Sequence, residues 1–266
     1  MIRDVALGQY YPSGGILHRL DPRGKVLMLI ATIVLIFCSF NFYALGLTAA
    51  FALLVVILSK VPLRIYLGSL KAIIFVILLT SLLNVFYGTG EPLWQWWIFK
   101  ITADGIRNSI FVTVRIIALV LMSSALTFTT TPTDLTDALE RLMKPLSLVG
   151  IRVHEIAMMM TIALRFVPTL LEETDKIMSA QKARGADIES GNLVARIKAL
   201  IPILVPLFVS AFRRAWDLAM AMECRCYQGG GGRTRMKQLH MKARDIFALF
   251  FMLLLTAGVV LCDIFL

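Results

Sequence analysis

Residues that could carry out chemistry are scattered along this sequence, and they do not form the set that a catalytic or metal site needs. His154-Glu155 begins like the zinc-protease pattern H-E-x-x-H, but Met158 stands where the second histidine would be. The sequence has neither a G-x-S-x-G nucleophile elbow nor a G-x-x-x-x-G-K-[ST] phosphate loop. The glycine run 229–232 is followed by Arg233-Thr234 and is interpreted as a hinge. We therefore expect a protein that is not an enzyme and that binds neither a metal nor a cofactor itself.

Two arginines at the ends of long segments are the stronger functional signal. Ala183-Arg184-Gly185 closes the first segment, and Cys224-Arg225-Cys226 closes the second, just before the glycine run. A single arginine at a helix end can simply complement the helix dipole, which is worth roughly 0.3–1 kcal/mol. Its planar fork can also bind a carboxylate bidentately. Because the pattern occurs twice between small residues, it favours docking of both arginines into a partner.

Each arginine is positioned by a predicted long amphipathic helix. Apolar residues recur every three or four positions over 156–178 and again over 194–222. Each helix has about thirty residues and a length on the order of 45 Å. Acidic and basic residues on the other side of the first helix, such as Glu172 and Lys176, exclude it from hydrocarbon.

Two crossing helices of this length have more apolar surface than one crossing covers. The excess predicts a platform for a partner, and packing of the helices on each other or on the membrane domain is the alternative. The predicted platform consists of Met159, Leu164, Leu171, Ile201, Leu204, Phe208 and Phe212.

The composition of the chain is that of an integral membrane protein. Its 266 residues are 58% hydrophobic and 17% charged, whereas soluble domains have about 45–50% apolar and about 25% charged residues. The net charge of +10 comes from bases that flank apolar segments. That distribution is typical of charges that set membrane topology, so it argues against nucleic acid as a partner.

Five apolar runs predict five membrane spans, at 26–40, 42–58, 72–86, 110–128 and 246–266. The expected fold is thus an all-α integral membrane protein with about five transmembrane helices plus cytoplasmic helices, two of them long, amphipathic and crossing. The expected domains are a membrane domain at 1–130 with four spans, a cytoplasmic helical domain at 131–245, and a final span at 246–266. The basic connections place the amino terminus of this multi-pass protein in the cytoplasm.

The connections between spans carry further signals. Trp94, Trp96 and Trp97 are typical of an interfacial aromatic belt, and 98–102 could form a short strand or hairpin.

Later in the chain, Thr133 or Asp134 is expected to cap a short helix that ends before Pro145. Arg115, inside the fourth span, is interpreted as an interfacial anchor, with a functional intramembrane charge as the alternative.

These segments resemble the transmembrane T component, EcfT, of energy-coupling factor transporters, which import vitamins and metal ions. Ala183-Arg184-Gly185 matches the first Ala-Arg-Gly motif of that family, and Cys224-Arg225-Cys226 stands where the second belongs. The segments 17–23 and 131–135 also resemble family segments, so the resemblance covers essentially the whole chain. Cys224 and Cys226 replace alanine and glycine, and both are small enough for Arg225 to dock.

The resemblance implies a complex with two cytoplasmic ABC ATPases, which bind ATP and Mg²⁺, and one small membrane S component, which binds the substrate. Arg184 and Arg225 would dock into the ATPases, and the crossing helices would carry the S component. Three other classes were weighed: a self-contained permease, for which Arg115 and Asp263 are poor candidates; a membrane hydrolase, which lacks a nucleophile–base set; and a scaffold that binds anionic lipid through 131–245.

Overall fold

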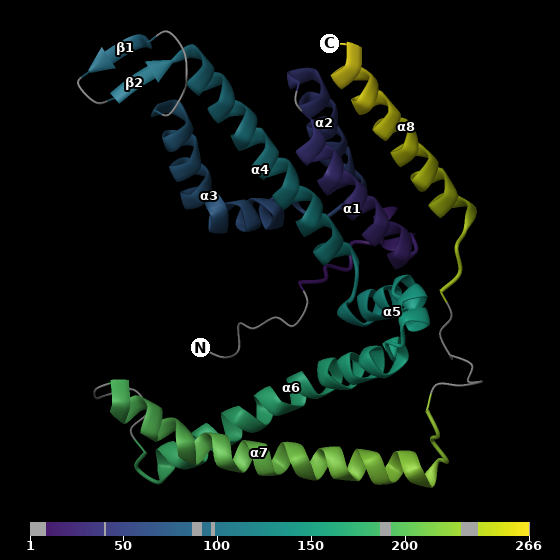
Figure 1. The fold of residues 1–266 in the computed structure, drawn as a ribbon. Coiled ribbons are helices and arrows are strands. Elements are labelled where there is room, and N and C mark those ends of the chain that lie inside the picture. The colour runs from purple at the N-terminus through teal and green to yellow at the C-terminus, as the bar shows by residue number, and fades with distance from the viewer. Residues whose placement is uncertain are drawn as a thin grey trace. The chain divides into compact units, whose positions relative to one another are not determined.

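The computed structural model describes residues 9–39, 41–86, 92–96, 99–186, 193–229 and 239–265. Their regular elements are helices, apart from one two-stranded hairpin, as expected (Figure 1). The chain divides into two compact units, Gly8–Ala138 with Gln238–Leu266, and Leu139–Lys237. The domain limits expected from the sequence, 1–130, 131–245 and 246–266, remain a prediction.

The first unit is a bundle of apolar helices. Its helices are α1 (Pro22–Cys38), α2 (Phe42–Ser59), α3 (Leu63–Phe86), α4 (Ala103–Thr129) and α8 (Ala243–Phe265). Helix α4 packs against α1, α2 and α3, while α8 packs against α1 and α2 (Figure 1). Side chains such as Ile36, Phe51, Met122 and Val259 form the core between α1, α2, α4 and α8. Each of the five helices covers all or most of one of the five predicted spans.

Six described helices are long and apolar enough to cross a membrane by length and composition. They are α2, α3, α4, α8 and two helices of the second unit, α6 (Val153–Ala183) and α7 (Leu193–Cys224). Helix α1 has 17 residues and is not among them. An all-α multi-pass membrane protein is therefore confirmed.

Four helices of the first unit, α1, α3, α4 and α8, begin before their predicted spans, and α2 begins where its span was predicted to begin. The side chain of Asp21 accepts a hydrogen bond from the amide of Arg23 at 2.9 Å and caps α1. Likewise, Thr102 accepts one from the amide of Gly105 at 3.1 Å and caps α4. An apolar run in the sequence marks only the part of a helix that fits into hydrocarbon. The start of the helix is marked by its polar cap, which can precede that run. Helix α3 also starts nine residues before its span and bends along its length (Figure 1).

Two connecting elements test local predictions. Strand β1 (Pro92–Trp96) pairs antiparallel with β2 (Phe99–Thr102), which confirms the hairpin. Trp97 lies outside the described residues, as do the hairpin side chains, so the aromatic belt remains a prediction.

Helix α5 (Pro132–Leu142) ends before Pro145 as expected, but the predicted cap was wrong. The hydroxyl of Thr131 accepts a hydrogen bond from the amide of Asp134 at 3.2 Å, so the cap is Thr131. Pro132 then occupies the first helical position, where its missing N–H has no consequence.

Two charged residues inside the first unit bind the turn between α1 and α2. A terminal nitrogen of Arg115, Nη2, donates a hydrogen bond to the carbonyl of Ser39 at 2.7 Å, and its guanidinium carbon lies 4.7 Å from the ring centre of Phe111. A carboxylate oxygen of Asp263 accepts from the amide of Asn41 at 3.1 Å. Arg115 is therefore a structural residue of this turn.

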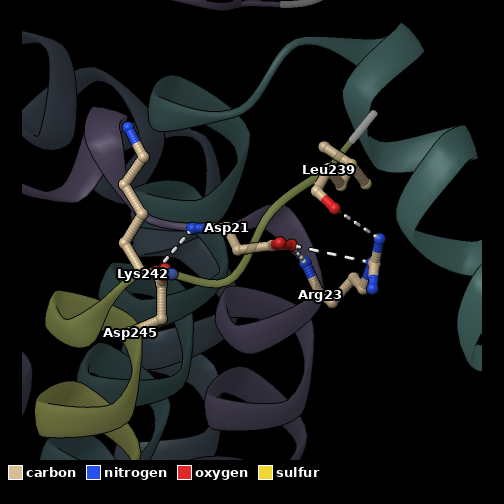
Figure 2. A network of polar contacts seen from close by, with 5 residues as sticks. All are labelled: Asp21, Arg23, Leu239, Lys242 and Asp245. Atoms are coloured by element: carbon tan, nitrogen blue, oxygen red, sulfur yellow. Dashed lines mark hydrogen bonds and ion pairs between the residues drawn. The ribbon is translucent and has the colours of Figure 1, made fainter. Parts of the chain in front are cut away.

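A polar network joins the first helix of the bundle to the last (Figure 2). One carboxylate oxygen of Asp245 accepts from the amide of Lys242, just before α8, and the other accepts from the amide of Asp21, just before α1; both distances are 2.7 Å. The guanidinium of Arg23 donates to the carbonyl of Leu239 at 3.2 Å. One buried carboxylate thus satisfies backbone donors at the starts of two helices that would otherwise lack partners.

Candidate functional site

The candidate site consists of the two long helices of the second unit. Helices α6 and α7 have 31 and 32 residues, which confirms the predicted length, and they cross (Figure 1). A carboxylate oxygen of Glu173 on α6 accepts from Nη2 of Arg214 at 2.8 Å, and the other accepts from the hydroxyl of Ser210. The side chain of Gln181 donates to the carbonyl of Pro202 at 3.2 Å. Later residues of α6 meet earlier residues of α7, so the helices are antiparallel.

Helix α6 ends in a hydrogen-bonding pattern known as a Schellman motif, in which amides beyond the helix bond back to its last turn. The amide of Gly185 donates to the carbonyl of Lys182, and the amide of Ala186 donates to that of Gln181, both at 3.0 Å. Gly185 has a φ of +86°, in the left-handed region that glycine adopts without strain. This pattern places Arg184 at the last, half-helical position, with its side chain exposed.

Helix α7 ends in the same way, although it lacks the glycine. The amide of Cys226 donates to the carbonyl of Glu223 at 2.8 Å, and the amide of Tyr227 donates to that of Met222 at 3.0 Å. Cys226 takes the glycine position with a φ of +55°. Arg225 is therefore held in the position that Arg184 has on α6, and replacement of the motif's glycine by cysteine leaves the geometry intact.

All six predicted docking residues, 183–185 and 224–226, are exposed. The structure does not bring the two arginines together, because the helices are antiparallel. Arg184 lies near the start of α7, since Gln181 bonds to Pro202. Arg225 follows Pro202 by 23 residues, or about 35 Å along the helix axis. The pair thus presents two equivalent arginine ends that are well separated.

Helix α7 has apolar residues on two sides. Ile203 is buried, and the half-buried Ser210 and Arg214 share its face, which contacts α6. The opposite side carries the four platform residues predicted on α7. Their exposed fractions are 52% for Ile201, 45% for Leu204, 60% for Phe208 and 73% for Phe212. The second unit therefore leaves a broad apolar face of α7 uncovered.

The remaining predicted platform residues lie on α6. Met159 is 58% exposed, whereas Leu164 and Leu171 are half-buried. Sequence reasoning missed Trp216, which is 70% exposed and continues the α7 face. Its position four residues after Phe212 is the signal that could have revealed it.

The histidine of the incomplete zinc pattern has a partner inside its own unit. Nδ1 of His154 lies 3.0 Å from a carboxylate oxygen of Glu140. Among the described residues, no three His, Cys, Asp or Glu side chains are grouped closely enough to hold a metal ion.

Comparison with known proteins extends over nearly the whole chain. Residues 14–238 match the family model CbiQ, described as cobalt transport protein. The energy-coupling factor transporter transmembrane protein EcfT of Clostridium kluyveri is 49% identical over 250 residues, covering 93% of each chain. The protein of the same name from Brevibacillus brevis is 50% identical over 246 residues, covering 92% of this chain and 93% of its own. That from Bacillus subtilis is 43% identical over 258 residues, covering 97% of each.

Proposed function

Because this chain belongs to the EcfT family of energy-coupling factor transporter transmembrane proteins, we propose that it couples two cytoplasmic ABC ATPases to a small membrane S component. The S component would bind a micronutrient, either a vitamin or a metal ion, and would determine which one is imported. ATP and Mg²⁺ would bind to the ATPases, and this chain would carry out no chemistry of its own.

The equivalent ends of α6 and α7 carry this proposal. Two ATPase subunits of similar shape need two similar docking elements, and Arg184 and Arg225 hold the same position in the same helix-end geometry. A guanidinium at a rigid helix end can enter a groove and bind a carboxylate there with two hydrogen bonds. Arg225 lies about 35 Å along α7 from Pro202, the residue that the end of α6 contacts, so each ATPase would have its own attachment point.

The uncovered face of α7 supports the second half of the proposal. Exposed apolar surfaces of this extent mark interaction sites in proteins. Leu204, Phe208 and Phe212 lie on the side of α7 that does not contact α6. A membrane S component with an apolar surface would bind there.

The ATPases and the S component would both bind to the same two helices, α6 and α7. Movement of one partner would therefore be transmitted to the other. Closure of the ATPases on ATP would move the ends of α6 and α7 and change the angle at which the helices cross. A changed angle reshapes the apolar face, so its affinity for the S component would differ between the two states. A difference of this kind is what allows one binding event to shift another.

We place the second unit in the cytoplasm of a prokaryotic cell and the chain in its cell membrane, with the amino terminus inside, from the distribution of basic residues. A self-contained permease would use intramembrane charges to bind its solute. Arg115 and Asp263 instead bind backbone groups of the α1–α2 turn.

The test is co-purification of the ATPases with an Arg184→Glu, Arg225→Glu double variant in mild detergent. Reversal of both charges should abolish ATPase capture, while the amount of chain in the membrane fraction stays unchanged. The matched control is Arg165→Glu with Arg213→Glu, because these two exposed arginines lie on the same helices away from their ends. Normal ATPase capture by the first double variant would refute the docking assignment.

A further inference from the structure

The first unit contains an apolar groove that the proposed coupling role does not use. It has a volume of about 540 Å³, within the range of roughly 300–1,000 Å³ that small-molecule sites occupy. The groove lies between α1, α2, α4 and α8, with the segment before α1 at one end. Its lining is almost entirely apolar and includes Met28, Phe51, Leu54, Phe247 and Leu254.

The length of the groove matches one leaflet of a bilayer. Along α8 its lining extends from Arg244 to Leu254, and ten residues of helix rise about 15 Å. Half of a hydrocarbon core is also about 15 Å. The lining residues of α1 lie in its first half and those of α4 in its second half, so the groove occupies one end of the bundle.

Basic side chains gather at that end of the groove. Arg244 and Lys25 line it directly. Nζ of Lys25 donates to the carbonyl of Thr129 at 2.9 Å and to the hydroxyl of Thr130 at 3.3 Å. Arg244 is exposed in the first turn of α8.

Three carboxylates, those of Asp21, Asp134 and Asp245, interact electrostatically with the buried Lys25, whereas Arg244 is exposed. Asp245 accepts from the amides of Asp21 and Lys242, and Asp21 accepts from the amide of Arg23. Figure 2 shows the Lys242 side chain extending away from Asp21 and Arg23. Arg244 is therefore the exposed base at this end of the groove that an anionic group could reach.

We propose that the groove binds one phospholipid, with an acyl chain along α8 and an anionic headgroup against Arg244. An apolar groove at membrane depth excludes water, because water there would lack the polar partners that it needs. An acyl chain fits its lining and its length, and a phosphate complements the exposed Arg244 at its end. The inference needs only the membrane location of the first unit and is independent of ATPase and S-component docking.

The test measures lipid retained by the full chain after purification from vesicles that contain phosphatidylglycerol and phosphatidylcholine in equal amounts. Wild-type chain should keep about one phosphatidylglycerol after washing with detergent, as measured by mass spectrometry. Arg244→Ala should lower the retained phosphatidylglycerol about fivefold, which corresponds to loss of one basic side chain beside an anionic lipid. Ala248→Trp should lower it too, because the larger side chain fills the groove.

Matched controls separate the groove from the general lipid shell. Lys242→Ala removes a neighbouring base, and Leu253→Trp enlarges a residue of α8, and neither residue lines the groove. Both variants should retain lipid like the wild type, and all variants should keep the wild-type melting temperature. Equal retention of both lipids, or unchanged retention in Arg244→Ala, would overturn the proposal. Greater retention after deletion of residues 1–8 would also overturn it, since that segment would then be the occupant.

Discussion

Cys226 holds a left-handed backbone conformation that glycine usually adopts. Its φ of +55° lies in the left-handed region, where a residue with a Cβ is less stable than glycine by roughly 1–2 kcal/mol. Two backbone hydrogen bonds from Cys226 and Tyr227 hold the conformation in place. The orientation of Arg225 depends on this closure.

We predict that Cys226→Gly stabilises the chain by up to about 1 kcal/mol, because the relief of strain exceeds the added entropy of the unfolded state. A higher melting temperature of the purified protein would show this, and ATPase capture should be unchanged. Cys224→Ala is the control and should have little effect, since Cys224 lies inside the helix. A lower melting temperature for Cys226→Gly would contradict the left-handed conformation.

The two helix ends were predictable to different degrees. At Arg184 the following glycine signals a helix end directly. At Arg225 no such signal exists, since cysteine seldom adopts a positive φ, and the resemblance to the second motif was the only guide. The geometry of Cys226 depends on bonds to Glu223 and Met222, which no local propensity reveals.

At the scale of the element, α7 is apolar on both sides, and this limits what periodicity can resolve. A single apolar stripe was predicted for it, yet Ala211 is partly buried while Phe208 and Phe212 are exposed. The acidic residues of α6 were expected on its charged outer side, but one of them, Glu173, bonds to Ser210 and Arg214 of α7. A sequence shows which positions share a face, but a polar contact within a helix pair appears only when both partners are placed.

We predict that Phe208→Asp or Leu204→Asp weakens S-component capture about tenfold or more while ATPase capture falls less. A buried unpaired charge at the centre of an interface costs at least 1–2 kcal/mol, and about 1.4 kcal/mol is a factor of ten. Pull-downs that quantify both partners from the same membranes provide the measurement. Arg213→Asp, also exposed but off the platform, should affect neither. A greater loss of ATPase than of S component would contradict the platform.

At the scale of the whole molecule, length and composition admit α6 and α7 as spans, whereas the proposed function keeps both in the cytoplasm. The two cases differ in where the ends of the helices lie. An antiparallel pair that crossed the bilayer would place Ala186, after α6, and Cys226, after α7, on opposite sides. A cytoplasmic pair places both on the same side.

We predict that a membrane-impermeant maleimide labels Cys226 and an Ala186→Cys variant only from the cytoplasmic side. Each cysteine should be the only one in its chain, and labelling should be compared between intact cells and inside-out vesicles. Asp104→Cys, in the first turn of α4, serves as the control and should react from outside. Labelling of Ala186→Cys and Cys226 from opposite sides would show that α6 and α7 span the membrane.

The five helices of the first unit were predictable because apolar runs of this length have few alternatives to crossing a bilayer. The hydrogen bond that joins the first helix of the bundle to the last was not predictable. Asp245 lies in a basic connection and Asp21 in a turn, and the pair is separated by 224 positions. Nothing local to either residue indicates the other.

That separation has a consequence for the biogenesis of the protein. A ribosome makes Asp245 224 positions after Asp21, so the amide before α1 enters the membrane without the Asp245 carboxylate and receives it only once α8 has been made. A chain truncated ahead of Asp245 leaves that donor without this partner, at a helix start where unmet amides are costly. The bond therefore distinguishes a helix bundle that includes α8 from one that lacks it.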